Sequence, residues 1–276
     1  MAARTIKNIG IIGLGRMGLP IAHRLMEGGY GLYGCDSTLT AADAARTAGI
    51  EILESAAKVA GASDATILLV GFETQVEDAV FGPDGVIAGA RPGGVLMIAS
   101  TVSPTYMKQL AGRAADAGMT VLDIPLAGGE MAAQKGDLLV YAGGDEAALE
   151  LCRPVLECFA ERIEYLGPAG AGQAAKAINN MLLWTCVTAT AEGLDLGESL
   201  GIDRERLREA LCHGSGANWA LRTRADERPA LWAEKDMELF LAEAAASGCA
   251  TPVGQTVRNA IAAFKKARGL PTPGME

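Results

Sequence analysis

Short apolar runs alternate with amphipathic helical patterns along the first part of the chain. The apolar runs have the length of buried strands, and Gly, Asp or Pro residues bound them. Strands are expected at residues 8–13, 31–35, 65–70, 94–99, 120–124 and 138–143, and helices at residues 17–27, 41–48, 104–117 and 146–159. Strands that alternate with helices are typical of a largely parallel sheet with both faces covered.

The strand pattern stops after about residue 165. Helical patterns follow at residues 172–200, 203–211, 231–246 and 252–266. Gly167 and Pro168 mark the change, because these two residue types interrupt regular structure. The chain is therefore expected to form an α/β Rossmann-type domain, a doubly wound parallel sheet over residues 1–166. An all-helical substrate and oligomerisation domain is expected over residues 167–276.

Composition excludes several classes of protein. The net charge is −9 and the pI is about 4.9, which disfavours a nucleic-acid partner. No apolar run reaches the ~18 residues of a membrane span, and the N-terminal residues lack the order of a signal peptide. The 6 cysteines form no CxxC pair and the 2 histidines, His23 and His213, lie far apart, so no metal site is expected. We expect a reduced, cytoplasmic protein.

A glycine motif, GLGRMG at residues 13–18, follows the first predicted strand and opens the first predicted helix. In that context the glycines allow a tight turn, close approach of a pyrophosphate and close packing of the helix. Asp36 stands at the end of the second predicted strand, where a carboxylate binds ribose hydroxyls and repels a 2′-phosphate. The motif predicts a nicotinamide dinucleotide site that favours NAD, with NADP less favoured. The alternative is an ordinary strand–helix turn with a capping aspartate.

Lys176 is unusual because it lies among apolar residues near the start of the long predicted helix. A desolvated lysine has a lowered pKa, which suits it to proton transfer near neutral pH. Asn180 is four residues further on and shares the same helix face. The alternative is a lysine that extends its amine to solvent from a mostly buried helix.

Four segments together give the chain its resemblance to a known family. They are GLGRMGLPIA at residues 13–22, STVSP at 100–104, DIPLAGG at 123–129, which continues to GDL at 136–138, and GAGQAAKAINN at 170–180; Lys235 and Asp236 add a shorter match. In these segments the chain resembles the β-hydroxyacid dehydrogenases, the group that includes 3-hydroxyisobutyrate dehydrogenase and tartronate semialdehyde reductase. The resemblance implies hydride transfer between a nicotinamide and a small, anionic 3-hydroxy acid or its semialdehyde.

The resemblance also implies a role for individual residues. Lys176 is the expected general acid/base and Asn180 its catalytic partner. The expected substrate-binding residues are Thr101, Ala127, Gly128, Gly129 and Lys235. The expected cofactor-binding residues are Gly13, Leu14, Gly15, Arg16, Met17, Gly18, Asp36, Val70, Thr101 and Lys235.

The chain departs from the family pattern around the expected substrate. Ala127 stands where the family usually has serine, which removes a hydroxyl from the substrate loop. Ala132 and Asp137 replace the usual Gly and Thr, and the stretch between Trp219 and Lys235 is short. The identity of the substrate is therefore open, whereas the pair of Lys176 and Asn180 is intact.

Two alternatives to a dehydrogenase remain. An imine reductase shares this architecture but reduces C=N bonds, and a non-catalytic protein would bind NAD(H) without turnover. The retained Lys176 and Asn180 argue against both. The 6-phosphogluconate dehydrogenases use a related NAD-binding domain but carry a larger helical domain. Apolar residues in the far half of the long helix (Val187, Ala189, Ala191, Leu194 and Leu196) favour burial against this or another subunit, so a homodimer or homotetramer is expected.

Overall fold

A computed structural model describes residues 5–270 of the 276-residue chain. The chain divides into two compact units, one that ends at Lys176 and one that begins at Ala177. The boundary predicted between residues 166 and 167 stays a prediction, and the outer ends of the two predicted domains, residues 1–4 and 271–276, lie outside the described residues.

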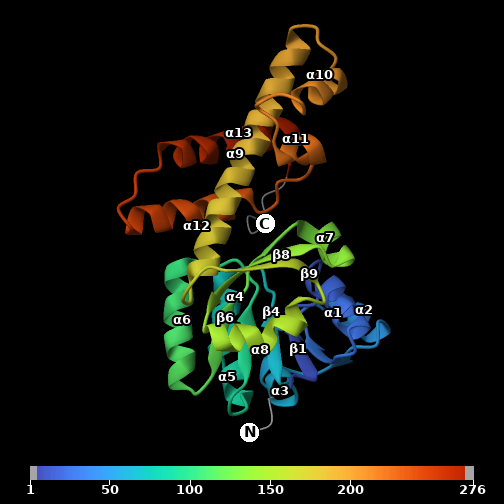
Figure 1. The fold of residues 1–276 in the computed structure, drawn as a ribbon, viewed down its shortest axis with the longest axis vertical. Coiled ribbons are helices and arrows are strands. Elements are labelled where there is room, and N and C mark those ends of the chain that lie inside the picture. Colours follow the sequence, from blue (N-terminus) through green and yellow to red (C-terminus); the bar gives the residue numbers. More distant parts are fainter. Residues whose placement is uncertain (1–4, 271–276) are drawn as a thin grey trace. The chain divides into compact units, whose positions relative to one another are not determined.

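The first unit is built on a sheet of nine strands within the described residues, in the order β3-β2-β1-β4-β5-β6-β8-β7, with β9 paired to β8 (Figure 1). The strands are β1 Asn8–Ile12, β2 Gly31–Cys35, β3 Glu51–Ile52, β4 Ala65–Leu68, β5 Val95–Ile98, β6 Thr120–Asp123, β7 Leu126–Ala127, β8 Leu138–Gly144 and β9 Ala160–Tyr165. β1 to β6 run parallel, so their carboxyl ends meet at one edge. The strand order reverses between β1 and β4, the place where open α/β sheets bind ligands.

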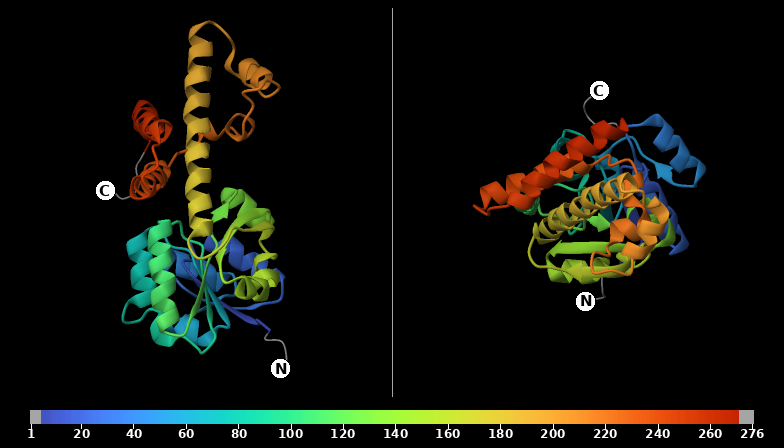
Figure 2. Two further views of the ribbon diagram at one scale, coloured as in Figure 1. Left: turned by 60° about the vertical axis from the view of Figure 1, so that its left-hand side comes forward. Right: turned by 90° about the horizontal axis from the view of Figure 1, so that it is seen from above.

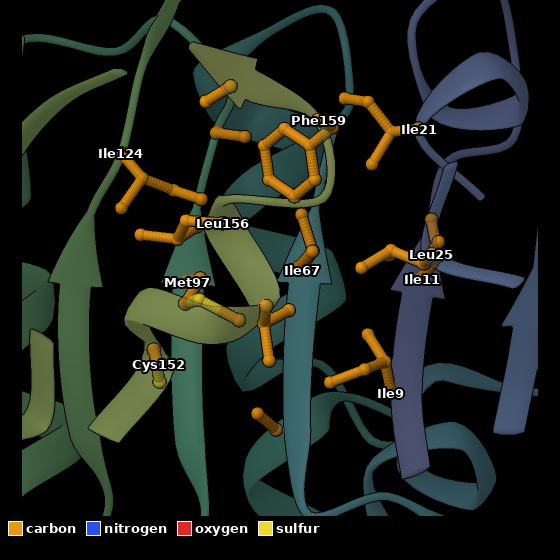
Figure 3. Packing of buried hydrophobic residues seen from close by; sticks show 14 of the residues in the cluster. Ile9, Ile11, Ile21, Leu25, Ile67, Met97, Ile124, Cys152, Leu156 and Phe159 are labelled. Atoms are coloured by element: carbon orange, nitrogen blue, oxygen red, sulfur yellow. The ribbon is translucent and has the colours of Figure 1, made fainter. Parts of the chain in front are cut away.

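Helices cover both faces of this sheet. They are α1 Gly18–Glu27, α2 Leu39–Thr47, α3 Ala56–Ala62, α4 Glu73–Phe81, α5 Val86–Gly89, α6 Pro104–Asp116, α7 Gly129–Lys135 and α8 Glu146–Leu156. One core packs the sheet against α1 and α8, where Ile11 and Ile67 meet Ile21, Leu25 and Leu156 (Figure 3). A second core packs the opposite face against α3, α4, α5 and α6. The predicted doubly wound fold is confirmed.

The far edge of the sheet is mixed, which the sequence pattern did not reveal. β8 runs antiparallel to β6 and to β7, and β9 returns parallel to β8. β9 has the sequence AERIEY, in which charged residues interrupt the apolar positions, so no buried strand was expected there. This edge carries the loop between β6 and α7.

The described part of the second unit, up to residue 270, contains helices only, as predicted. They are α9 Ala171–Ser199, which begins in the first unit, α10 Arg204–Leu211, α11 Trp219–Thr223, the 3₁₀ helix η1 Ala225–Glu227, α12 Ala233–Ala246 and α13 Pro252–Arg268 (Figure 2). Val187 and Ala191 of α9 pack with Met237, Ile261 and Phe264 in the core of this unit. Among the residues that the structure describes, no helix is both long and apolar enough to cross a membrane.

A cluster of charged residues holds α10 to η1. Asp226 has a fully buried side chain and accepts two hydrogen bonds from Arg208, at 2.9 and 3.0 Å. Arg204 approaches the same carboxylate at 3.4 Å, and Arg208 also donates to Glu227 at 2.9 Å. Asp226 and Glu227 both lie in η1, so these ion pairs connect η1 to α10.

Candidate active site

The glycine loop after β1 has the geometry that its sequence predicts. Gly13 has φ of 93°, and a Cβ there would lie 2.2 Å from the carbonyl oxygen of Leu69. A Cβ on Gly18 would lie 1.9 Å from the carbonyl oxygen of Gly13, so only glycine lets α1 begin this close to the strand. At Gly15, by contrast, a Cβ would point into open space, with no heavy atom within 4 Å.

The start of α1 fits an anionic group. Met17 at the N-cap makes no side-chain capping hydrogen bond, and the first turn contains no acidic residue. The backbone N–H groups of a helix N-terminus carry a partial positive charge that attracts phosphate. The exposed Gly15 lets such a group reach the backbone. The loop therefore fits the pyrophosphate of a dinucleotide.

Asp36 follows β2 and lies beside this loop. Its Oδ2 accepts a hydrogen bond from the backbone N–H of Leu14 at 2.7 Å, and its Oδ1 accepts one from Thr38 at 2.7 Å. The carboxylate is only partly buried, so it retains acceptor capacity for a ribose hydroxyl. Burial and the Asp36 charge together raise the pKa of the neighbouring Cys35 thiol to about 11, so Cys35 is a protonated, inert thiol at neutral pH.

Arg16 points from the glycine loop toward α7. Its Nε lies 2.9 Å from Oε2 of Glu130, and both side chains are substantially exposed. A cavity of about 640 Å³ borders this pair, lined by residues of the glycine loop, α1, α2 and α7. Asp36, Val70 and Thr101 are not among its lining residues, so this cavity covers only one flank of the predicted cofactor site.

Val70 and Thr101 follow the neighbouring strands β4 and β5. The backbone N–H of Val70 donates to Oγ of Ser100 at 2.7 Å, which ties the two strand ends together. Because β1, β2, β4 and β5 are parallel, these residues share one edge of the sheet with the glycine loop and Asp36. The fold thus brings together the predicted cofactor residues of the first unit.

The predicted substrate loop lies at the end of β7. Ala127 is partly buried, whereas Gly128 and Gly129 are exposed. Gly128 and Gly129 have φ of 117° and 74°, values that other residue types rarely adopt. The left-handed backbone conformation therefore favours glycine at both positions, whether or not a ligand binds there.

Lys176 and Asn180 lie one turn apart on α9, as their spacing predicts. Asn180 Oδ1 accepts a hydrogen bond from Nδ2 of Asn179 at 3.1 Å. The Lys176 residue is partly buried, and the expectation of an amine largely removed from water stays a prediction. Lys235 lies on α12 of the second unit, and its Nζ is 5.6 Å from the centre of the Trp232 ring, within cation–π range.

Comparisons with known proteins agree with this geometry. Residues 8–167 match the sequence model described as the NAD binding domain of 6-phosphogluconate dehydrogenase, and residues 170–272 match the one described as NAD-binding of NADP-dependent 3-hydroxyisobutyrate dehydrogenase. The chain is 37% identical to the NAD-dependent L-serine dehydrogenase of Pseudomonas aeruginosa over 78% of this chain and 72% of that protein. The chain belongs to the β-hydroxyacid dehydrogenase family.

Solved structures of the β-hydroxyacid dehydrogenase family share the whole fold. The 3-hydroxyisobutyrate dehydrogenase of Mycobacterium tuberculosis, solved with L-serine, has a TM-score of 0.86 and 32% identity and covers 95% of this chain and 94% of its own. An imine reductase of Streptomyces aurantiacus has a TM-score of 0.68 at 21% identity over 96% of both chains, which is a likeness of fold alone. The prediction of a nicotinamide-dependent hydroxy-acid oxidoreductase is confirmed at the level of the family.

Two buried polar residues of this family member, Asp123 and Gln173, were not among the predicted site residues. Both are fully buried. Asp123 accepts hydrogen bonds from backbone N–H groups at the start of α9, and the Gln173 side chain binds the backbone on either side of Thr101. A signal for Asp123 was present, because a carboxylate at the end of a fully buried strand requires partners. Gln173 had no comparable signal, since a glutamine in the first turn of a helix is ordinarily solvated.

Proposed function

We propose that the protein catalyses reversible hydride transfer between a nicotinamide dinucleotide and the hydroxyl-bearing carbon of a small 3-hydroxy acid. The observation that carries the proposal is the position of Lys176. It lies on the same helix face as Gln173, whose side chain hydrogen bonds the backbone of Ser100 and Val102 on either side of Thr101. This arrangement supports a proton-transferring amine at the edge of the sheet where the cofactor motif lies.

In this proposal Lys176 moves one proton. During oxidation its neutral amine takes the hydroxyl proton as the C–H bond breaks and the hydride leaves; during reduction the ammonium returns that proton to the carbonyl oxygen. The bound nicotinamide supplies the two-electron chemistry. A cationic Lys176 also stabilises the developing alkoxide. Asn180, one turn on, holds the substrate oxygen or the lysine amine in place.

The residues of the first unit that we propose to bind the cofactor lie at the same edge of the sheet. The N–H groups at the start of α1 bind the pyrophosphate, Asp36 binds the adenosine ribose, and Val70 and Thr101 lie toward the nicotinamide. Lys235, on α12 of the second unit, stays a predicted cofactor- and substrate-binding residue. A carboxylate at Asp36 favours NAD, because it accepts ribose hydroxyls and repels a 2′-phosphate.

We expect Asp36→Ala to raise the NADP-to-NAD ratio of kcat/KM by about 10–100-fold, the range of one hydrogen bond to a charged group. Since Asp36 also holds the N–H groups of Leu14 and Thr38, the absolute values with both cofactors should fall. The ratio is therefore the quantity to measure. Asp43→Ala is the matched control, because it removes an exposed carboxylate from neighbouring α2. An unchanged ratio in Asp36→Ala would make Asp36 purely structural.

The substrate class follows from the substrate loop. Gly128 and Gly129 are exposed and lack side chains. In this proposal their backbone N–H groups bind the carboxylate of the substrate. Ala127 offers no hydroxyl to such a group, which removes one hydrogen bond to a charged ligand, about 1.5–3 kcal/mol. We propose a small anionic hydroxy acid that relies on backbone donors, with Thr101 as a further contact.

A substrate screen tests the function. The purified protein is supplied with L-serine, 3-hydroxyisobutyrate and related 3-hydroxy acids, each with NAD or NADP, and turnover is read from NADH or NADPH absorbance. We expect NAD-linked oxidation of at least one hydroxy acid. A parallel arm supplies a cyclic imine with NADH and NADPH. Faster imine reduction would favour an imine reductase, and dinucleotide binding without any turnover would favour a non-catalytic protein.

The helical unit also supports a homodimer or homotetramer. Val187, Ala191 and Leu194 of α9 are buried, whereas Leu182 and Leu196 of the same helix are 58% and 60% exposed. Exposed large apolar side chains on one helix are typical of a surface that another subunit covers. We therefore propose that the protein forms a homodimer or homotetramer.

A further inference from the structure

Asp123, the last residue of β6, binds the beginning of α9. Its side chain is fully buried. Its Oδ1 accepts a hydrogen bond from the backbone N–H of Gly170 at 3.0 Å, and its Oδ2 accepts one from Gln173 at 2.9 Å. Burial raises the pKa of the Asp123 carboxyl, and the backbone hydrogen bonds oppose that rise by stabilising the charged form. One carboxylate thus satisfies two N–H groups that a helix start leaves without partners.

Gln173 extends the same connection to β5. Its Nε2 donates to the carbonyl oxygen of Ser100 at 2.8 Å, and its Oε1 accepts from the N–H of Val102 at 3.2 Å. The amide therefore pairs with residues 100–102 as a neighbouring strand would. Ser100 in turn accepts a hydrogen bond from the N–H of Val70. A single buried network joins the ends of β4, β5 and β6 to the first turn of α9.

Close packing around the first turn of α9 restricts the position of that turn. A Cβ on Gly172 would lie 2.3 Å from the carbonyl oxygen of Tyr141 and 2.8 Å from Oδ2 of Asp123. A Cβ on Gly143 would lie 2.6 Å from Oδ1 of the same carboxylate. The backbone therefore surrounds the Asp123 carboxylate on two sides. Such contacts define one position of the helix start rather than a range of positions.

We propose that Asp123 and Gln173 are positioning residues for the reaction, and that they fix Lys176 against the segment that carries Thr101. Lys176 is three residues after Gln173, so both side chains lie on one helix face. Because Gln173 points at residues 100–102, the same face of α9 directs Lys176 toward that edge of the sheet. This inference rests on the proposed function, in which Lys176 transfers the proton.

The test compares Gln173→Met and Asp123→Asn with the unaltered protein. Gln173→Met keeps the side-chain length but removes both hydrogen bonds, and Asp123→Asn removes the charge and one acceptor. We expect each variant to lower kcat for 3-hydroxyisobutyrate or L-serine by about 10–100-fold, the effect of a small misplacement of a reacting group. The dissociation constant of NADH should stay within about threefold, since groups that bind the dinucleotide are unaltered.

Two further readouts separate positioning from a general structural role. Substrate deuterated at the hydroxyl-bearing carbon should show a larger isotope effect on kcat in both variants, because the chemical step becomes rate-limiting. Asp64→Asn is the matched control. Asp64 also accepts two backbone N–H bonds, from Lys7 and Asn8 at 2.9 Å each, but at the opposite edge of the sheet. Asp64→Asn should leave kcat and the isotope effect unchanged.

A double variant tests whether Gln173 acts through Lys176. If Gln173 acts through Lys176, Gln173→Met should lower the residual turnover of Lys176→Ala by less than about threefold, because residues that act as a unit are non-additive. A full multiplicative loss would make Gln173 a structural residue and overturn the inference, as would unaltered kcat in both folded single variants. If one single variant does not fold, the other decides. An active Lys176→Ala would instead overturn the proposed function itself.

Discussion

Replacement of Lys176 with alanine is expected to lower kcat by about 10²–10⁴-fold, the usual contribution of a general acid or base. Without the lysine amine, oxidation must pass the hydroxyl proton to water, which is a weaker base, and reduction must draw a proton from water, which is a weaker acid than the ammonium. The NADH dissociation constant should stay nearly unchanged, because the glycine loop and Asp36 lie on other elements of the first unit. Steady-state turnover and NADH fluorescence titration measure the two quantities.

Lys58→Ala is the matched control for that variant. Lys58 belongs to the same unit, its side chain is 62% exposed, and its Nζ lies 3.0 Å from the exposed carboxylate of Glu54. Its loss should leave turnover and NADH binding as they are. Normal turnover in Lys176→Ala would contradict the proton-transfer role. Loss of NADH binding in that variant would show instead that the lysine holds the cofactor.

The parallel sheet was predictable because its central strands, β1, β4, β5 and β6, are buried on both faces. β1, β2, β4, β5 and β6 each read as a continuous or nearly continuous apolar run, which only a buried strand or core helix produces. β3 and β7 have two residues each, too few to form any pattern. β9 is stabilised by pairing with β8, a long-range contact that local sequence does not encode.

Candidate site residues were predictable where a contiguous motif carries them. The glycines at residues 13–18 owe their identity to local backbone geometry, so sequence alone reveals them. The partners of Asp123 are different, because Gly170 and Gln173 lie about fifty residues further along the chain. Likewise, nothing in the sequence indicates that Asp36 also binds Leu14. Contacts of this kind depend on the tertiary arrangement of the strand ends.

Removal of one partner of the buried ion pair is expected to destabilise the helical unit. Asp226→Ala should lower the free energy of unfolding by about 3–5 kcal/mol, because it leaves the buried guanidinium of Arg208 without its main partner. Urea unfolding followed by tryptophan fluorescence measures this unit, because the 3 tryptophans, Trp184, Trp219 and Trp232, all lie in it. Glu198→Ala is the control, since it removes a half-exposed partner of Arg204 and should cost about 0–1 kcal/mol.

The same pair sets the acid sensitivity of the helical unit. Burial acts to raise the pKa of Asp226, but hydrogen bonds and charge from Arg208 outweigh it, so the pKa is lowered. A lowered folded-state pKa means that this stabilisation is present above the unfolded value of about 3.9 and is lost as pH falls through the folded value. The free energy of unfolding should therefore fall with acidification below about pH 4, and the fall should be smaller in Asp226→Ala. Equal acid dependence in the two proteins would exclude Asp226 as the group responsible.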